Sequence, residues 1–268
     1  MQEISLDNEY YKTIDGVLYT ADYETIIRYP IAHNLEKYEI HSSTKKINEN
    51  CFNNCINLKE LIISDNVTNV GAYSLNNLIS LSKLTIGKSV EELDYKLFQG
   101  TYNIDDLIVV DNNYYYDSRN NCNAIVETLT NKVIYGTKNT IIPDSIEVIG
   151  QYAFYNNTNL KNIVIPQNVV TIEKYAFWMC SSLENVYLEN GVESIMYFAF
   201  ADCKSLRSIF IPNSVIYMEN NVFYRPNEYL TIKCEVSSVP NTWDLYWNWG
   251  GHLTGPNQYI VTYYGQNR

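Results

Sequence analysis

The sequence predicts an α/β solenoid, in which a 23-residue unit recurs along the chain and its copies stack on one another. Three observations support this fold class. The same residue types return every 23 residues, the second half of each unit alternates apolar and polar residues, and one position inside the unit is almost always phenylalanine. One such unit cannot bury its apolar face alone, whereas stacked copies share a continuous core.

Seven windows carry the repeat. They open at Thr44, Val67, Val90, Ile146, Val169, Val192 and Val215. Position 9, counted from each opening residue, is Phe52, Leu75, Phe98, Phe154, Phe177, Phe200 and Phe223. We expect these side chains to lie in the core, with Phe177 packed between its counterparts in the two neighbouring repeats.

The second half of each window predicts a β-strand. From Leu160 to Ile165 the sequence is L-K-N-I-V-I, in which apolar residues two apart indicate a strand with one buried face. From Ile149 to Phe154, the first half places Ile, Ala and Phe at i, i+4 and i+5, a spacing that favours a short helix or 3-10 turn. The predicted architecture has a parallel sheet on one face and these helical turns on the other.

The same residues resemble a known family. Ile149 to Phe154 reads I-G-Q-Y-A-F and Ala199 to Leu206 reads A-F-A-D-C-K-S-L, which is similar to the BspA-type leucine-rich repeat of bacterial surface proteins and some parasitic protists. The resemblance covers residues 44–113 and 146–237, although Tyr73-Ser74-Leu75 departs from the pattern. It implies a right-handed superhelix that recognises proteins, in adhesion or host interaction, at the cell surface or after secretion.

Breaks in the period divide the chain into five predicted segments. These are an N-terminal β cap unit (1–43), three repeats (44–112), a β insertion (113–145), four repeats (146–237) and a tryptophan-rich C-terminal cap (238–268). The cap and the insertion each contain short strand-like runs, which we interpret as small antiparallel units. Residues 259–263 predict a last strand.

The C-terminal cap contains Trp243, Trp247 and Trp249. We expect these rings to cover the apolar end of the last repeat. The alternative is a platform on which a sugar stacks, so the three residues are secondary binding candidates and a glycan is an alternative partner.

Charge excludes several classes of partner. The formal net charge is −11 and the isoelectric point is about 4.7, whereas nucleic-acid binding requires a basic surface. An anionic membrane surface is excluded for the same reason, and no apolar run is long enough for membrane insertion. The N-terminus lacks the features of a signal peptide. An intracellular assembly scaffold therefore stays open beside the cell-surface prediction, and we expect a monomer.

Motifs of catalysis are missing from the sequence. It contains no G-x-S-x-G, H-E-x-x-H or G-x-G-x-x-G, and Gly87-Lys88-Ser89 lacks the upstream glycine of a phosphate-binding loop. His33 and His41 lie in the N-terminal unit and His252 lies in the C-terminal cap, so a site that used all three would have to bridge opposite ends of the solenoid. We therefore predict no catalytic residue, metal or cofactor, with a carbohydrate-active protein as a remote alternative.

Three of the six cysteines share position 12 of their repeats: Cys55, Cys180 and Cys203. We expect inert buried thiols, because free cysteine is among the most buried residue types. The alternative is a Cys180–Cys203 disulfide, since adjacent repeats lie about 5 Å apart.

The predicted sheet presents one row of side chains outward at position 19, between two inward positions. The candidate partner-binding residues are the larger apolar members of this row: Ile62, Ile108, Val164, Tyr187 and Phe210. Exposed apolar residues with polar neighbours mark interaction surfaces, although aromatic and β-branched residues also suit strands for their own sake. Tyr187 and Phe210 come from consecutive repeats, so we expect them about 5 Å apart on neighbouring strands.

Overall fold

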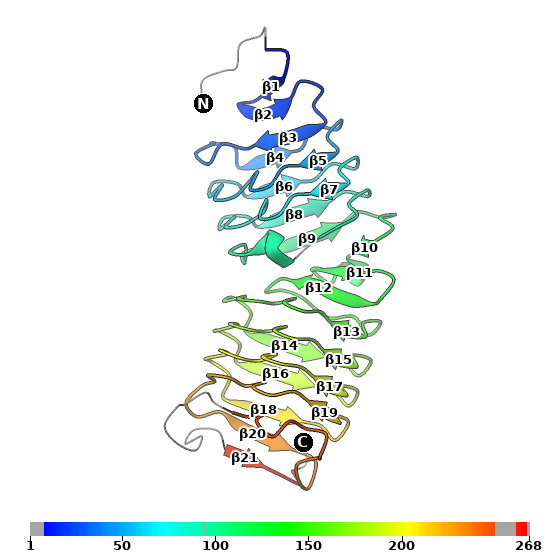
Figure 1. Ribbon diagram of the computed structural model, residues 1–268, viewed down its shortest axis with the longest axis vertical. Coiled ribbons are helices and arrows are strands. Elements are labelled where there is room, and N and C mark those ends of the chain that lie inside the picture. Colours follow the sequence, from blue (N-terminus) through cyan, green and yellow to red (C-terminus); the bar gives the residue numbers. More distant parts are fainter. Residues whose placement is uncertain (1–7, 94, 250–260, 267–268) are drawn as a thin grey trace. The chain divides into compact units, whose positions relative to one another are not determined.

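The structure is a computed structural model that describes residues 8–93, 95–249 and 261–266. The chain divides into two compact units, residues 1–128 (unit 1) and 129–268 (unit 2), each of which is a stack of repeats (Figure 1). The boundary between the units falls inside the predicted 113–145 insertion.

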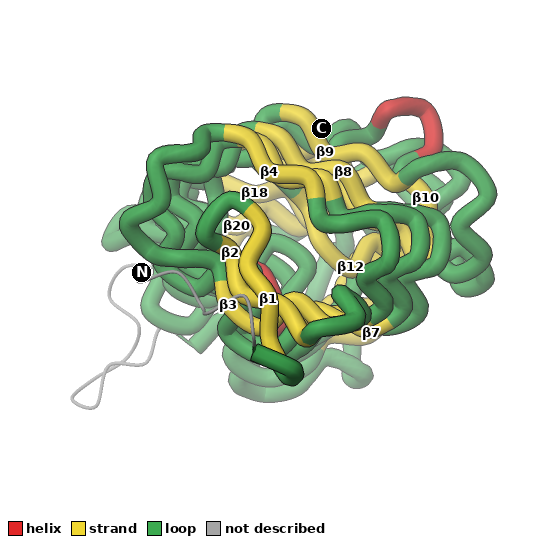
Figure 2. The backbone as a smooth tube through the Cα atoms, turned by 90° about the horizontal axis from the view of Figure 1, so that it is seen from above, coloured by secondary structure: helices red, strands yellow, loops and turns green. Residues whose placement is uncertain are grey.

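Unit 1 is built of short strands. They are β1 (Tyr11–Ile14), β2 (Val17–Thr20), β3 (Thr25–Arg28), β4 (Lys37–Glu39), β5 (Lys46–Ile47), β6 (Glu60–Ile62), β7 (Asn69–Val70), β8 (Lys83–Ile86), β9 (Asp106–Val109), β10 (Tyr116–Asp117) and β11 (Ala124–Glu127). One sheet has the order β1-β2-β3-β5-β7, antiparallel as far as β3 and parallel beyond, and the other is the parallel sheet β4-β6-β8-β9. Figure 2 shows the strands of these two sheets on opposite sides of unit 1.

Unit 2 repeats this plan. Its strands are β12 (Lys132–Gly136), β13 (Val148–Ile149), β14 (Asn162–Ile165), β15 (Thr171–Ile172), β16 (Asn185–Leu188), β17 (Ser194–Ile195), β18 (Ser208–Ile211), β19 (Tyr217–Met218), β20 (Thr231–Cys234) and β21 (Val261–Tyr263). Strands β12, β13, β15, β17 and β19 form one parallel sheet. The longer strands form two further parallel sheets, β14-β16 and β18-β20-β21.

Strand register confirms the 23-residue period. Ile163 of β14 pairs with Val186 of β16, and Ile209 of β18 pairs with Ile232 of β20, each pair 23 residues apart. The solenoid and its stacked parallel sheets are therefore as predicted. Residues 259 and 260 of the predicted last strand lie outside the described residues, as does His252, and β21 begins at Val261.

Phenylalanine rings form the centre of unit 2. The rings of Phe154 and Phe177 stack with centroids 4.8 Å apart, those of Phe177 and Phe200 at 5.1 Å, and those of Phe200 and Phe223 at 5.8 Å. All four side chains are buried. The predicted burial of Phe177 between two neighbouring phenylalanines is confirmed.

The first half of the repeat, which was predicted to be a helical turn, has a different structure. Among the described residues, helix is limited to the 3-10 segments η1 (Tyr95–Phe98) and η2 (Arg119–Asn121). Elsewhere the first half of the repeat is a two-residue strand at positions 3 and 4 followed by tight turns. Positions 7 and 11 of these turns have positive φ, at Asn50, Asn54, Tyr73, Asn77, Tyr152, Asn156, Tyr175, Met179, Phe198, Asp202, Asn221 and Arg225. Because a right-handed helix cannot pass through left-handed residues, the turns interrupt it.

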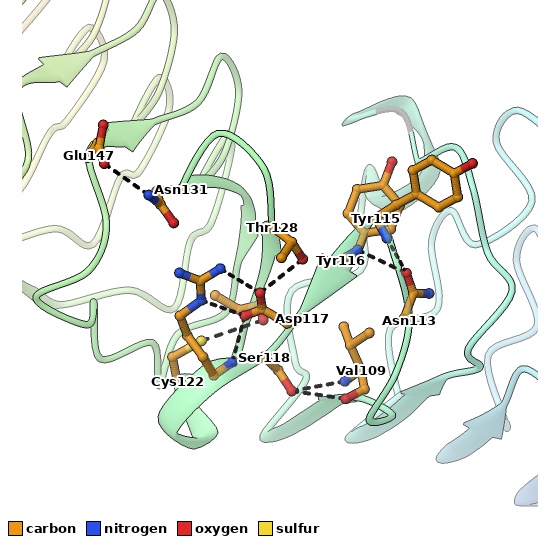
Figure 3. A network of polar contacts seen from close by, with 12 residues as sticks. Val109, Asn113, Tyr115, Tyr116, Asp117, Ser118, Cys122, Thr128, Asn131 and Glu147 are labelled. Atoms are coloured by element: carbon orange, nitrogen blue, oxygen red, sulfur yellow. Dashed lines mark hydrogen bonds and ion pairs between the residues drawn. The ribbon is translucent and has the colours of Figure 1, made fainter.

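The segment around η2 is held in unit 1 by the partly buried carboxylate of Asp117 (Figure 3). Asp117 accepts hydrogen bonds from the Arg119 side chain at 2.8 and 2.6 Å and from the Thr128 hydroxyl at 3.0 Å. Ser118 donates its hydroxyl to the backbone carbonyl of Val109 and accepts from the amide of the same residue. Burial raises the pKa of Asp117, but these hydrogen bonds and the nearby guanidinium outweigh it, so the pKa lies below its usual range.

Candidate functional site

The strands at positions 17–20 place position 19 on the outer face of the sheet. In β14 and β16 exposed and buried residues alternate, and the first and third residues face outward. Val164 is 51 % exposed, Tyr187 is 60 % exposed and Ile108 is 37 % exposed, while Ile62 and Phe210 are partly exposed. The predicted outward direction of this row is therefore confirmed.

Three of the five candidates meet in one place. Val164, Tyr187 and Phe210 line a single hollow in unit 2 with a volume of about 600 Å³. Ile62 and Ile108 lie on the corresponding sheet of unit 1, on β6 and β9. Val164, Tyr187 and Phe210 thus share a concave surface. Such a surface can accommodate an anchor side chain of a partner.

The hollow lies where the outer sheet of unit 2 is divided. Strand β16 pairs with β14 and strand β18 pairs with β20, and the two pairs belong to different sheets, although β16 and β18 are neighbours (Figure 1). Tyr187 and Phe210 therefore lie on neighbouring strands, as predicted, but these two strands belong to different sheets. The hollow is also lined by the core-facing residues Val186, Leu188 and Ile209. It therefore extends toward the apolar interior.

Position 17, the polar row beside these residues, differs between the units. In unit 1 the corresponding residues of β4, β6, β8 and β9 alternate in charge, with Lys37 2.9 Å from Glu60 and Lys83 3.5 Å from Asp106. In unit 2 the row contains only neutral residues, Asn162, Asn185, Ser208 and Thr231. Contact with a partner therefore desolvates neutral groups on unit 2 and ion pairs on unit 1, and charged groups are the more costly to desolvate.

The tryptophans of the C-terminal segment are packed inward. Trp243 and Trp247 are buried, with ring centroids 4.9 Å apart, and Trp249 is half-buried. The indole N–H of Trp243 donates to the carbonyl of Val215 at 3.1 Å, and Trp247 meets Phe223 edge to face. The buried faces of Trp243 and Trp247 are occupied by protein, so they offer no platform to a sugar.

A cluster of aromatic residues on the turns of unit 2 was missed by the sequence analysis. The rings of Tyr152 and Tyr175 stack at 4.9 Å with an angle of 2°, and those of Phe198 and Tyr224 stack at 4.8 Å. Trp178 contacts Tyr175 and donates its indole N–H to Asp202. The recurrence of aromatic residues at position 7 is the signal that could have revealed it. The rings face one another, which indicates a role in bracing the turns.

The cysteines of position 12 are buried as expected. The thiols of Cys180 and Cys203 donate to the carbonyl oxygens of Phe154 and Phe177, at 2.9 and 3.3 Å, and Cys55 donates to Tyr29. Burial raises the pKa of each of these thiols, that of Cys55 to about 12. Because the thiolate is the reactive form, these groups have little reactivity at neutral pH. Within the described residues, no cluster of His, Cys, Asp and Glu has an arrangement that could hold a metal ion.

The stacked 23-residue units and the L-x-x-I-x-I strands define a leucine-rich repeat solenoid. The model of the BspA-type leucine-rich repeat region matches residues 31–137 and 131–242. The chain therefore belongs to the BspA-type leucine-rich repeat family.

Solved structures share the fold at low sequence identity. A leucine-rich cell-surface protein of Faecalibacterium prausnitzii is 17 % identical, with 97 % of this chain and 87 % of that chain covered and a TM-score of 0.52. The pneumococcal vaccine antigen PcpA is 17 % identical, with 98 % of this chain and 78 % of that chain covered and a TM-score of 0.57. The comparison with curated proteins gives no match. None of the helices in the described part of the chain has the length and apolarity of a membrane span.

Proposed function

We propose that the chain is a non-enzymatic protein-recognition module, at the cell surface or secreted, that serves in adhesion or host interaction. The observation that carries this proposal is the hollow lined by Val164, Tyr187 and Phe210 on the outer sheet of unit 2. The similarity to a bacterial cell-surface protein and to a pneumococcal antigen supports the location.

The chemistry of the hollow suits contact with a protein. Tyrosine and phenylalanine are common anchors of interfaces, and Tyr187 has most of its surface free for a partner. Neutral Asn185 and Ser208 border the aromatic residues and supply hydrogen-bonding groups at the rim. The carboxylate of Glu189, which also lines the hollow, accepts a hydrogen bond from the amide of Gln167 at 3.0 Å and is therefore already engaged. A binding role agrees better with this lining than catalysis does.

The proposal predicts a separation of binding from folding. We expect the double variant Tyr187→Ala/Phe210→Ala to lose about 30-fold or more in affinity, which is about 2 kcal/mol. Its free energy of unfolding should fall by about 1 kcal/mol per site or less, because both side chains face outward. The measurement is biolayer interferometry against an array of purified host matrix and secreted proteins, together with equilibrium denaturation.

The matched control changes the same repeat position in unit 1. Ile62→Ala/Ile108→Ala should leave binding within about twofold, since these residues do not line the hollow. Equal loss of binding in both double variants, or unchanged binding in the unit 2 variant, would show that this hollow is not the binding site.

A further inference from the structure

A second hollow adjoins the first on unit 2. It has a volume of about 480 Å³ and is lined by Glu184, Asn185, Lys204, Ser205, Arg207, Ser208 and Asn227. Asn185 and Ser208 line both hollows. The two hollows therefore form one groove along the division between β16 and β18, with an apolar half beside Tyr187 and a polar half before the start of β18.

The groove has a cation toward each end that the protein itself does not neutralise. Arg207 lines the polar half and Lys233 lines the apolar half. Across the residues that the structure describes, neither has a carboxylate within ion-pair distance. Lys204, by contrast, lies 3.4 Å from Asp202.

Arg207 and Lys233 differ in this respect from several lysines of unit 1. Those lysines pair with carboxylates of neighbouring repeats, as in Lys59 with Glu36 at 2.6 Å and Lys88 with Asp65 at 3.6 Å. The net charge of −11 provides many carboxylates that could serve the same purpose at Arg207. Its guanidinium is exposed and carries five N–H donors suited to a carboxylate. Glu184 also lines this half and offsets part of the attraction of Arg207 for a single carboxylate, so we expect a ligand with more than one negative charge.

We propose that this groove binds an extended, acidic peptide segment of the partner, with an apolar side chain in the Tyr187–Phe210 half and acidic side chains at Arg207. The proposal rests on the proposed function and adds the chemistry of the partner. Arg207 precedes Phe210 by three residues, which is about 10 Å along a strand at about 3.3 Å per residue. An extended ligand therefore has its apolar anchor two to four residues from its acidic pair.

The test measures the binding of two fluorescein-labelled peptides to the full chain. The acidic probe is Gly-Ser-Phe-Ser-Ser-Asp-Glu-Gly-Ser, and the basic probe replaces Asp-Glu by Lys-Lys; each is also made with the order reversed. Fluorescence anisotropy measures both against the wild-type chain. We expect the acidic probe, in one of the two orders, to bind at least tenfold more tightly, and its affinity to fall as salt is added because the contact is electrostatic and exposed.

A charge reversal makes the test specific. Arg207→Glu should weaken the acidic probe at least tenfold and strengthen the basic probe. The matched control is Lys161→Glu, since Lys161 has the same position two repeats earlier and lines neither hollow. This control should leave both probes within about twofold. Circular dichroism confirms that each variant is folded.

The outcomes separate this inference from the proposed function. If the acidic and basic probes bind equally well and both lose binding in Tyr187→Ala/Phe210→Ala, the acidic-peptide inference is wrong. The hollow would still be supported as a binding site. Binding of neither probe also overturns the inference, while the protein array decides the proposed function independently. Reversed preference in Arg207→Glu, with no change in Lys161→Glu, supports the groove.

Discussion

Bulky side chains in the left-handed region recur in the turns of unit 2. Tyr152, Tyr175 and Phe198 have φ near +60°, at which a β-carbon crowds the following carbonyl oxygen. Each such residue costs about 1–2 kcal/mol relative to glycine. Ring stacking of about 0.5–1.5 kcal/mol per pair offsets part of this cost, as between Tyr152 and Tyr175. Aromatic residues at position 7 therefore contribute contacts that asparagine, the usual left-handed residue, cannot make.

This argument predicts an inverted order of two small substitutions. At most positions glycine is less stable than alanine, but at Tyr175 we expect Tyr175→Gly to be more stable than Tyr175→Ala by about 1 kcal/mol. Both variants lose the same ring contacts, so the difference reports the backbone alone. Equilibrium denaturation with urea measures it. In the comparison pair Tyr187→Gly and Tyr187→Ala, on strand β16, alanine should be the more stable. The same order at both sites would contradict the argument.

At the level of the element, the alternation of apolar and polar residues predicts a strand reliably, whereas helical spacing of apolar residues does not by itself predict a helix. Strands at positions 17–20 follow from apolar residues two apart, because only a strand places such residues on one face. The spacing i, i+4 and i+5 in Ile149, Ala153 and Phe154 is equally satisfied by a two-residue strand and tight turns. Composition does not distinguish them at Tyr152, because tyrosine has no preference for positive φ.

The element around η2 provides a test of pH dependence. The pKa of Asp117 is lowered in the folded chain, so its carboxylate stabilises unit 1 above the unfolded pKa near 4, and this contribution is lost as pH falls through the folded value. We expect Asp117→Asn to be less stable at neutral pH by about 1.5–3 kcal/mol, the range for hydrogen bonds to a charged group. The difference should shrink toward about pH 3.

Thermal unfolding from neutral to acidic pH measures this difference. Asp111→Asn serves as the control, because Asp111 is an exposed carboxylate two residues before Asn113 in the same unit. Its stability should follow that of the wild-type chain at every pH. A constant difference between wild type and Asp117→Asn across the pH range would indicate that the asparagine acts through packing and not through charge.

At the scale of the whole chain, the sequence predicts the solenoid and the outward row but not the groove. Periodicity determines both the stacking of repeats and the direction of Tyr187 and Phe210. The division between β16 and β18 depends on how two strands approach, and Ser208–Ile211 has the same alternating pattern as Asn162–Ile165, which is paired with β16. The charges of Arg207 and Lys233 cannot be interpreted from the sequence alone. Only the structure shows that, among the described residues, no carboxylate lies within ion-pair distance of them.

The stacking of repeats also predicts how the effect of a core substitution spreads through unit 2. Phe177→Ala removes the second ring of a four-ring stack, and we expect the free energy of unfolding to fall by about 3–5 kcal/mol, as for other buried aromatic residues truncated to alanine. In a solenoid each repeat contacts only its neighbours, so hydrogen exchange should increase most around Phe154 and Phe200 and less around Phe223. Urea denaturation and hydrogen–deuterium exchange measure the two effects. Lys161→Ala, an exposed change in the same unit, should alter neither. A stability loss below about 1 kcal/mol, or exchange that rises equally at all three rings, would contradict stacking as the source of stability.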